Sequence, residues 1–314
     1  MKHVLGCLAI AASAALLPAV ATAAEPASCK TIRMSDPGWT DITSTNAMFG
    51  IVADALGYKQ KVDSLAVPIT FQALKNGQLD AFLGNWMPAQ AHFVEPLEKT
   101  GDLVSVHTNL QGIRFTLAVP AYVADAGVKN FADLAKNADK FEKTFYGIEP
   151  GAPANQHIQE MITAKEFGLG DWKLVESSEQ GMLSQVERAE RAKKWIVFLA
   201  WEPHPMNTKY KLTYLAGGDK YFGPNFGAAM VNTVERKNYE KECPNVGKLL
   251  SQVTFNVDME NTIMSQILDD NADPKKAAMK QLKANPKLVD SWLEGVTTMD
   301  GGDAKAAVHK ALGL

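Results

Sequence analysis

The chain has 314 residues, of which 46% are hydrophobic and 21% are charged, so it is long enough to bury the core of two lobes or of one large domain. Its formal net charge is −3, and no basic run occurs in it. This balance argues against a nucleic-acid partner.

The first residues of the chain are typical of an export signal. A short polar start is followed by an apolar, alanine-rich run over residues 4–20 and by small residues that lead to a cleavage site near Ala24. The apolar run is short for a membrane-spanning helix and is broken by Pro18, which argues against a membrane anchor. Cys7 precedes most of the apolar region, so we reject a lipoprotein site there. We predict a signal peptide over 1–24 and a mature protein in the periplasm.

Removal of the signal peptide leaves two cysteines, Cys29 and Cys243. In an exported chain, two cysteines without a Cys-x-x-Cys motif indicate one structural disulfide rather than a redox site. A loop of about 200 residues closed in this way would stabilise the fold by roughly 4–5 kcal/mol. The bond would also place the mature N-terminus beside the segment near residue 243, so that early and late sequence share a lobe.

Short apolar strands alternate with amphipathic helices after the signal peptide. We predict strands over residues 31–34, 61–67 and 79–83, and helices over 43–56 and 69–75. This β-α-β-α-β order indicates a parallel sheet with helices on its faces. In such sheets ligands bind outside the carboxyl ends of the strands.

A second unit of the same kind begins near residue 114. Its elements lead to the apolar segment Trp195–Trp201, the strongest predicted strand of the chain, and a short strand, a Gly/Pro-rich loop and several helices follow. The predicted division is a first lobe over 25–113, a second lobe over 114–204 and a return to the first lobe over 205–314, with crossings near 112–116 and 203–211.

Three tryptophans lie in Gly/Pro-marked turns at the ends of predicted strands. These turns are Gly38–Asp41 with Trp39, Gly84–Pro88 with Trp86, and Trp201–Pro205. Three rings that converge on one point would form a cage for an organic cation. Each ring alone has the alternative role of covering the core at a strand end. For the remaining tryptophans packing is the better interpretation: Trp172, Trp195 and Trp292.

No motif for catalysis accompanies these turns. The sequence has no Gly-x-Ser-x-Gly elbow, no phosphate-binding loop and no His-Glu-x-x-His pair. No mature histidine lies four residues from another, so we expect surface or hydrogen-bonded roles for all of them: His92, His107, His157, His204 and His309. We therefore predict that the chain is not an enzyme and holds no metal or cofactor.

The Trp-bearing turns resemble those of the periplasmic choline-binding proteins of ABC importers and, more loosely, those of glycine betaine and proline betaine receptors. The resemblance covers the whole mature chain in order. It implies an α/β fold of the two-lobe periplasmic binding protein kind (type II), with a mainly parallel sheet flanked by helices in each lobe and the ligand in the cleft between them. The supporting stretches are Leu117–Tyr122, Tyr146–Gly151, Val175–Met182, Tyr214–Asp219 and Phe222–Gly227.

The resemblance also implies an aromatic box around a quaternary ammonium group, with Asp41 holding the hydroxyl of the ligand. A trimethylammonium group has no N–H to donate, so ring faces and a nearby carboxylate are its natural partners. Asp41 has a second interpretation, as the cap of the helix predicted from about Thr43. Carried over by position, the walls of the box are Trp39, Trp86, Phe115 and Trp201.

Two positions depart from the choline receptors, which have Tyr at Phe115 and Asn at Ala152. Phe115 keeps the face of the ring and loses a hydroxyl. Ala152 removes an amide that helps to grip the choline hydroxyl, and nearby Asn155 is the candidate substitute. We therefore expect either weaker choline binding or the binding of a bulkier relative of choline.

A zwitterion such as glycine betaine or carnitine carries a carboxylate that Asp41 would repel. Arg114 is the candidate counter-charge, but strand alternation points it away from Phe115, and a solvated surface position is the better interpretation. Asp41 therefore favours a net cation that carries a hydroxyl or an ester.

The predicted function is that of the substrate-binding component of an ABC importer, a monomer that captures choline or a close quaternary ammonium cation and delivers it to an inner-membrane permease. Acetylcholine, glycine betaine and carnitine are the alternative ligands. Two other functions stay open. One is a periplasmic sensor module for the same ligands, and the other is a hydrolase of choline esters, for which we find no activated nucleophile.

Overall fold

The computed structural model describes residues 24–314. The predicted signal peptide, with Cys7, lies outside the described residues except for Ala24. The strands are β1 (Thr31–Asp36), β2 (Lys59–Ser64), β3 (Ala81–Met87), β4 (Leu103–Pro120), β5 (Thr144–Tyr146), β6 (Lys173–Val175), β7 (Val197–Glu202), β8 (Leu212–Tyr214) and β9 (Ala228–Arg236).

The helices are α1 (Thr40–Ala55), α2 (Val67–Lys75), α3 (Ala91–Thr100), α4 (Ala121–Asp125), α5 (Pro153–Thr163), α6 (Glu179–Ala192), α7 (Met206–Lys209), α8 (Asp219–Phe222), α9 (Pro224–Gly227), α10 (Tyr239–Glu242), α11 (Pro244–Leu250), α12 (Val257–Leu268), α13 (Pro274–Ala284), α14 (Pro286–Trp292) and α15 (Ala304–Leu312). Short 3-10 helices cover Ala27–Lys30, Phe131–Asp133, Ala135–Phe141 and Glu166–Gly168.

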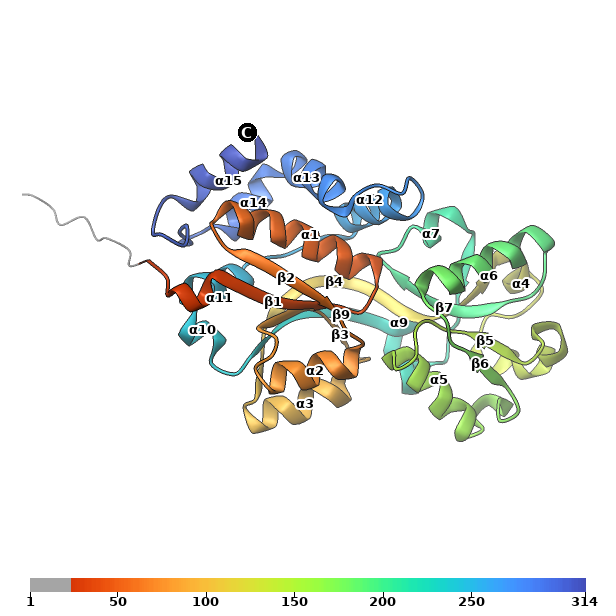
Figure 1. The fold of residues 1–314 in the computed structure, drawn as a ribbon. Helices are drawn as coiled ribbons and strands as arrows, with labels where there is room; N and C mark the ends of the chain where they lie inside the picture. Colours follow the sequence, from red (N-terminus) through yellow and green to blue (C-terminus); the bar gives the residue numbers. More distant parts are fainter. Residues whose placement is uncertain (1–23) are drawn as a thin grey trace, which may run out of the picture.

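The molecule is an α/β protein of two lobes, as predicted, and Figure 1 shows β1 to β3 in one lobe and β5 to β7 in the other. Strands β1 and β2, which precede and follow α1 in the chain, pair in parallel, and this confirms the predicted β-α-β start. The first turn is fixed by Asp36, whose Oδ1 accepts hydrogen bonds from the backbone N–H groups of Gly38 (2.7 Å) and Trp39 (3.2 Å). Gly38 has a φ of +93°, which favours glycine at this position.

The strand directions of the larger sheet are mixed. Its order is β3-β9-β4-β7-β5-β6, with β8 paired to β4. Only β5 pairs in parallel with its neighbours β6 and β7, whereas β3–β9, β9–β4, β4–β7 and β4–β8 are antiparallel. The prediction of a mainly parallel sheet in each lobe is therefore wrong in this detail. The reason is the course of the chain: β4 runs out of the first lobe, and β9 runs back along it in the opposite direction, so the two strands pair antiparallel.

Strand β4 passes from the first lobe into the second as one continuous strand (Figure 1). It pairs with β9 from Leu103 to Arg114 and with β7 from Arg114 to Ala118. The change of partner lies at Arg114, and we propose that the first crossing between the lobes, predicted at 112–116, lies there.

The segment between β7 and β9 packs with the second lobe. Strand β8 pairs with the last residues of β4, from Ala118 to Pro120, and Ala216 forms a bridge to Asn130. We therefore propose that the second crossing lies at β9, near residue 228, rather than at 203–211. A Gly/Pro-rich composition marks the loop before β9 but does not reveal which lobe that loop covers.

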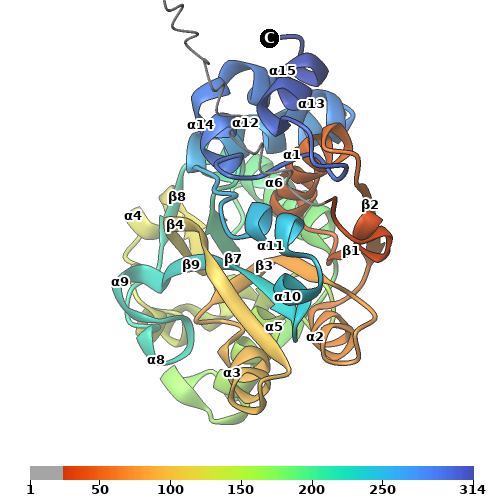
Figure 2. The ribbon, with the colours of Figure 1, turned by 90° about the vertical axis from the view of Figure 1, so that its left-hand side faces the viewer.

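The C-terminal helices belong to the first lobe. Helix α1 packs against α12 and α13, and Figures 1 and 2 show α12 to α15 as a layer on the side opposite α2 and α3. Trp292 is completely buried in this layer, edge-on to Phe255 with ring centroids 5.8 Å apart. Within residues 24–314, no helix is both long enough and apolar enough to cross a membrane.

The predicted disulfide between Cys29 and Cys243 is present and joins positions 214 residues apart in the chain. It ties the 3-10 helix before β1 to the N-terminus of α11. Glu25 strengthens the same connection, because its Oε1 accepts a hydrogen bond from the backbone N–H of Asn245 at 2.6 Å. Early and late sequence therefore share a lobe, as predicted.

Candidate functional site

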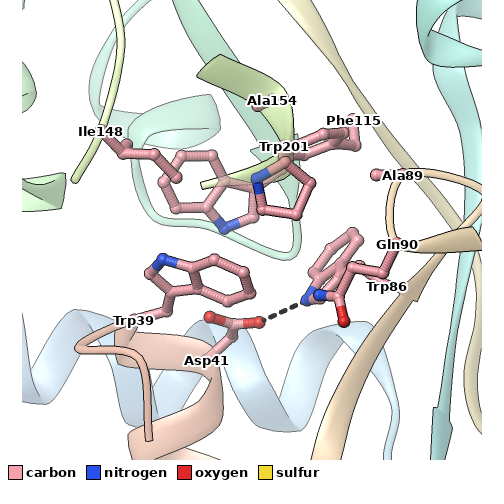
Figure 3. Close-up of a pocket in the computed structure, with 10 residues that line it drawn as sticks. Trp39, Asp41, Trp86, Ala89, Gln90, Phe115, Ile148, Ala154 and Trp201 are labelled. Atoms are coloured by element: carbon pink, nitrogen blue, oxygen red, sulfur yellow. Dashed lines mark hydrogen bonds between the residues drawn. The ribbon is translucent and has the colours of Figure 1, made fainter. Parts of the chain in front are cut away.

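Five of the six predicted ligand-binding residues line a single pocket. Figure 3 shows the three indole rings around a common space, with Asp41 between Trp39 and Trp86. The rings come from different elements, because Trp39 is the N-cap of α1, Trp86 lies in β3 and Trp201 in β7. The complete lining is Trp39, Asp41, Trp86, Ala89, Gln90, Phe115, Ile148, Pro153, Ala154 and Trp201.

The fourth ring, Phe115 of β4, is held against two of the others. It is the direct cross-strand neighbour of Trp201 in the β4–β7 pair, and neighbours of this kind project on the same face of a sheet. Its ring centroid lies 5.8 Å from that of Trp86. Gly227 (φ +71°) lies against the backbone of Phe115, where a Cβ would come within 2.2 Å of the Phe115 carbonyl oxygen. The aromatic wall is therefore fixed by contacts that leave no room for a side chain at residue 227.

Asp41 supplies the charge of the pocket. It is only 2% exposed, and its Oδ2 accepts a hydrogen bond from Trp86 Nε1 at 3.0 Å (Figure 3). Its Oδ1 has no hydrogen-bond partner. Burial, reinforced by the charge of Glu179, raises the pKa of Asp41 to about 8. Asp41 is not the N-cap of α1, a position held by Trp39, so the helix-cap interpretation does not hold.

Glu149 is a second carboxylate at the pocket, and sequence reasoning did not single it out. It follows β5 in the second lobe, and its Oε1 accepts a hydrogen bond from Trp39 Nε1 at 2.9 Å. Burial raises the pKa of Glu149 to about 7. The only sequence signal for it was its place in the Tyr146–Gly151 stretch. The bond fixes the Trp39 ring from the opposite lobe.

Gln90 is another lining residue that sequence reasoning missed. Its side chain is completely buried, and its Nε2 donates a hydrogen bond to the carbonyl oxygen of Gly84 at 2.9 Å. That bond fixes the orientation of the amide and leaves Oε1 without a partner. Together with Asp41 Oδ1, the pocket lining thus offers two unpartnered oxygen atoms, both of them acceptors.

Asn155 does not line the pocket, in contrast to its predicted role as a substitute for the missing amide at Ala152. Its Oδ1 accepts a hydrogen bond from the backbone N–H of Ile148 at 3.1 Å. Its Nδ2 donates to the carbonyl oxygens of Ile148 and Glu149 and to Glu176 Oε1, at 3.0 to 3.1 Å. The amide is thus used to hold the turn after β5. Asn155 therefore positions backbone rather than facing a ligand.

Arg114 also lies outside the pocket lining. Its Nε is 2.9 Å from Glu202 Oε2, and its guanidinium lies over the Tyr214 ring at 5.3 Å. Its charge is thus paired on the half-exposed edge of β4, as the strand alternation predicts. The described part of the chain also contains no cluster of His, Cys, Asp or Glu suited to a metal ion.

The arrangement defines the class of the protein as a two-lobe receptor with an aromatic pocket between its lobes. The chain belongs to the family of substrate-binding domains of ABC-type glycine betaine transport systems, whose model matches residues 30–284. The family consists of transporter components rather than enzymes, in agreement with the sequence analysis.

The chain is similar to solved structures of an ABC-transporter choline-binding protein. Its TM-score is 0.90 with the choline complex, at 51% identity, with 92% of this chain and 100% of that chain covered. For the unliganded semi-closed form the TM-score is 0.84, again at 51% identity, with 91% and 100% covered. The higher score with the liganded form, and the Trp39–Glu149 hydrogen bond across the cleft, agree with a closed arrangement of the lobes.

A curated relative is the glycine betaine/carnitine transport binding protein GbuC of Listeria monocytogenes. It is 31% identical over 169 residues, which span 53% of this chain and 54% of GbuC. The relatives thus include receptors named for different quaternary ammonium compounds. Which of those ligands this chain prefers depends on the residues that line its pocket.

Proposed function

We propose that this protein captures choline, or a close quaternary ammonium cation that carries a hydroxyl or an ester, for an ABC importer. The observation that carries the proposal is a pocket walled by four aromatic rings with a buried carboxylate between two of them. Ring faces attract a trimethylammonium group at roughly 1–2 kcal/mol each when desolvated, which is a large part of the ~8 kcal/mol of a micromolar site. The similarity to a choline-binding protein supports the same assignment.

The polar end of the pocket favours a hydroxyl over a carboxylate. The fully buried side-chain atoms of the lining that lack a partner are the acceptors Asp41 Oδ1 and Gln90 Oε1. A hydroxyl can donate to either of them, whereas the carboxylate of glycine betaine or carnitine would meet acceptors of like or partial negative charge. We infer that choline binds more tightly than the two zwitterions, by both its charge and its hydroxyl donor. Acetylcholine shares the net positive charge but has no donor for these oxygens, so only its charge favours it over the zwitterions.

We also propose that the protein works in the periplasm as a monomer and that the closed receptor delivers its ligand to an inner-membrane permease. The family assignment supports a transporter partner. Contacts of the ligand with residues of both lobes stabilise the closed form, because the ligand can make all of these contacts only when the lobes approach. The predicted signal peptide supports the location.

The test is calorimetric titration of the ligand-free mature protein with choline, acetylcholine, glycine betaine and carnitine. We expect choline or acetylcholine to bind at micromolar concentration and the zwitterions at least tenfold more weakly. If no compound binds below the millimolar range, the cation pocket is not the function of this chain. If glycine betaine binds tightest, the role of Asp41 has been misread.

A further inference from the structure

We propose that Glu179, oriented by His204, is a positioning residue that latches the two lobes together and fixes Trp39 and Asp41 in place when the ligand is bound. This inference rests on the proposed function, because it concerns how the pocket closes over its cation. Glu179 does not line the pocket, and His204 does not either.

The side chain of Glu179, which lies in the second lobe, caps the N-terminus of α1 in the first lobe. It is the first residue of α6 in the second lobe and is 1% exposed. Its Oε2 accepts a hydrogen bond from the backbone N–H of Thr40, and its Oε1 accepts one from Thr40 Oγ1, both at 2.7 Å. Thr40 is the first residue of α1, whose N-cap provides no side-chain hydrogen bond. A backbone N–H group at a helix start needs such an acceptor, and the positive end of the helix favours a carboxylate.

The position of Thr40 explains why this bond matters for the ligand. Thr40 lies between Trp39 and Asp41, both of which line the pocket. Holding its backbone and its hydroxyl at once fixes the start of α1 against the second lobe. The ring and the carboxylate on either side of Thr40 are then held in the orientation that faces the pocket.

His204 holds Glu179 in this position from within the second lobe. The histidine is 1% exposed, and its Nδ1 accepts a hydrogen bond from the backbone N–H of Met206 at 2.9 Å. The ring hydrogen therefore lies on Nε2, which is 3.0 Å from Glu179 Oε1 and donates to it. The His204 ring packs edge-on against Trp201, with centroids 4.8 Å apart. A continuous chain of contacts thus runs from Trp201 of one lobe through Glu179 to the start of α1 in the other.

The latch depends on the charge of the ligand. In the closed arrangement, burial and then repulsion from Glu179 disfavour the ionised form of Asp41, so an ionised Asp41 opposes closure of an empty pocket. A cation between the rings offsets this repulsion, after which the hydrogen bonds to Thr40 retain the closed form. Another ion pair between the lobes, Lys209 with Asp269 at 3.1 Å, is solvent-exposed on the lysine side and contributes little.

The test is Glu179→Gln, studied by stopped-flow fluorescence of choline binding and release. The amide keeps the size of the side chain but puts an N–H group against one of the donors, Thr40 or His204. Because the bonds form only on closure, we expect the dissociation rate to rise about tenfold to a hundredfold and the association rate to change less than threefold. Glu187→Gln is the matched control, since Glu187 lies on the same helix and pairs with Arg191 at the surface. Its rates should stay within twofold of the unmodified protein.

Thr40→Val provides a second variant that removes the hydroxyl donor without touching the buried carboxylate. We expect it to speed release by itself and to add less than twofold in the Glu179→Gln background, because both changes weaken the same contact between Glu179 and Thr40. Release at the unmodified rate in both single variants would overturn the latch. A loss expressed entirely in the association rate would also overturn it. If the unmodified protein fails to bind choline, the proposed function fails instead, and the two failures are thereby distinguished.

Discussion

Asp41→Asn isolates the contribution of charge to the pocket, because the two side chains have the same shape. In the variant the amide oxygen can still accept the hydrogen bond of Trp86 Nε1, now made to Asp41 Oδ2 at 3.0 Å. The unpartnered Oδ1 is replaced by an NH₂ group that faces the cation with a partial positive charge. Only the negative charge and one acceptor are lost.

The size of the effect follows from Coulomb attraction in a partly desolvated site. A carboxylate and a quaternary nitrogen about 5 Å apart attract each other by roughly 3 kcal/mol at an effective dielectric constant of about 20. We therefore expect the affinity for choline to fall about 30-fold to 150-fold. Stability should change in the opposite sense, because burial raises the pKa of Asp41 from 3.8 to about 8. That rise corresponds to roughly 6 kcal/mol for ionising this group in the empty closed pocket.

Calorimetry and thermal unfolding at pH 8.5 test the predicted loss of choline affinity and the predicted gain in stability together. The variant should bind choline far more weakly and, without ligand, should melt at an equal or higher temperature. Asp54→Asn is the matched control, because Asp54 lies on the same helix, is exposed and pairs with Lys275. Affinity within threefold of the unmodified protein would refute the role of the charge. A lower melting temperature of the ligand-free variant would show that the substitution had damaged the fold.

Three further predictions concern the rings, the pH dependence and the disulfide. Trp86→Ala removes one wall and the donor to Asp41, so calorimetry should find at least a tenfold loss of choline affinity; unaltered affinity would make Trp86 a core residue. In the closed pocket burial raises the pKa of Asp41 to about 8 and that of Glu149 to about 7; the charge of Glu179 adds to both shifts, Asp36 adds to that of Asp41, and Glu176 adds to that of Glu149. Asp41 in turn helps to raise the pKa of buried Glu260. A bound cation favours the ionised forms, so affinity should rise severalfold from pH 6 to pH 8.5 with proton release, and a flat profile would show that both groups are ionised before binding. Replacing Cys29 and Cys243 with serine should lower the free energy of unfolding by about 5 kcal/mol. Denaturant unfolding measures this loss, and choline affinity should stay within twofold; a large loss of affinity would contradict the separation of the disulfide from the pocket.

The aromatic part of the site could be predicted because its signals are local. Trp39, Trp86 and Trp201 each lie in a turn marked by glycine or proline at the end of a strand, and the resemblance placed Phe115 beside them. Bulky rings at such positions indicate a ligand site without any knowledge of how the lobes approach.

Apart from Asp41, the polar part could not be predicted, because it depends on contacts between distant segments. Glu179 is 139 residues from Thr40, and neither side chain carries a motif that identifies the other as its partner. For Asn155, in contrast, the sequence suggested a ligand contact, but the residue is not part of the pocket lining. It is close in sequence to the position where an amide was expected, but the backbone of the turn after β5 uses all of its hydrogen-bonding groups.

Strand β9 is the main element that sequence reasoning missed. Its residues do not alternate cleanly between apolar and polar, because the strand lies between β3 and β4 and its burial changes along its length. Without β9, the first lobe looked like a parallel sheet, and the second crossing was predicted at 203–211 rather than at the position near residue 228 that we propose.

The disulfide encloses all of the pocket residues in one covalent ring, because they lie between Cys29 and Cys243 in the chain. A protease that cuts a surface loop between these cysteines would leave both fragments joined through sulfur. The nicked molecule would migrate as one species on a non-reducing gel and would keep its four aromatic walls on one particle. The covalent loop closed by the disulfide thus also keeps all of the pocket residues in one covalently linked molecule after a single cleavage of the backbone.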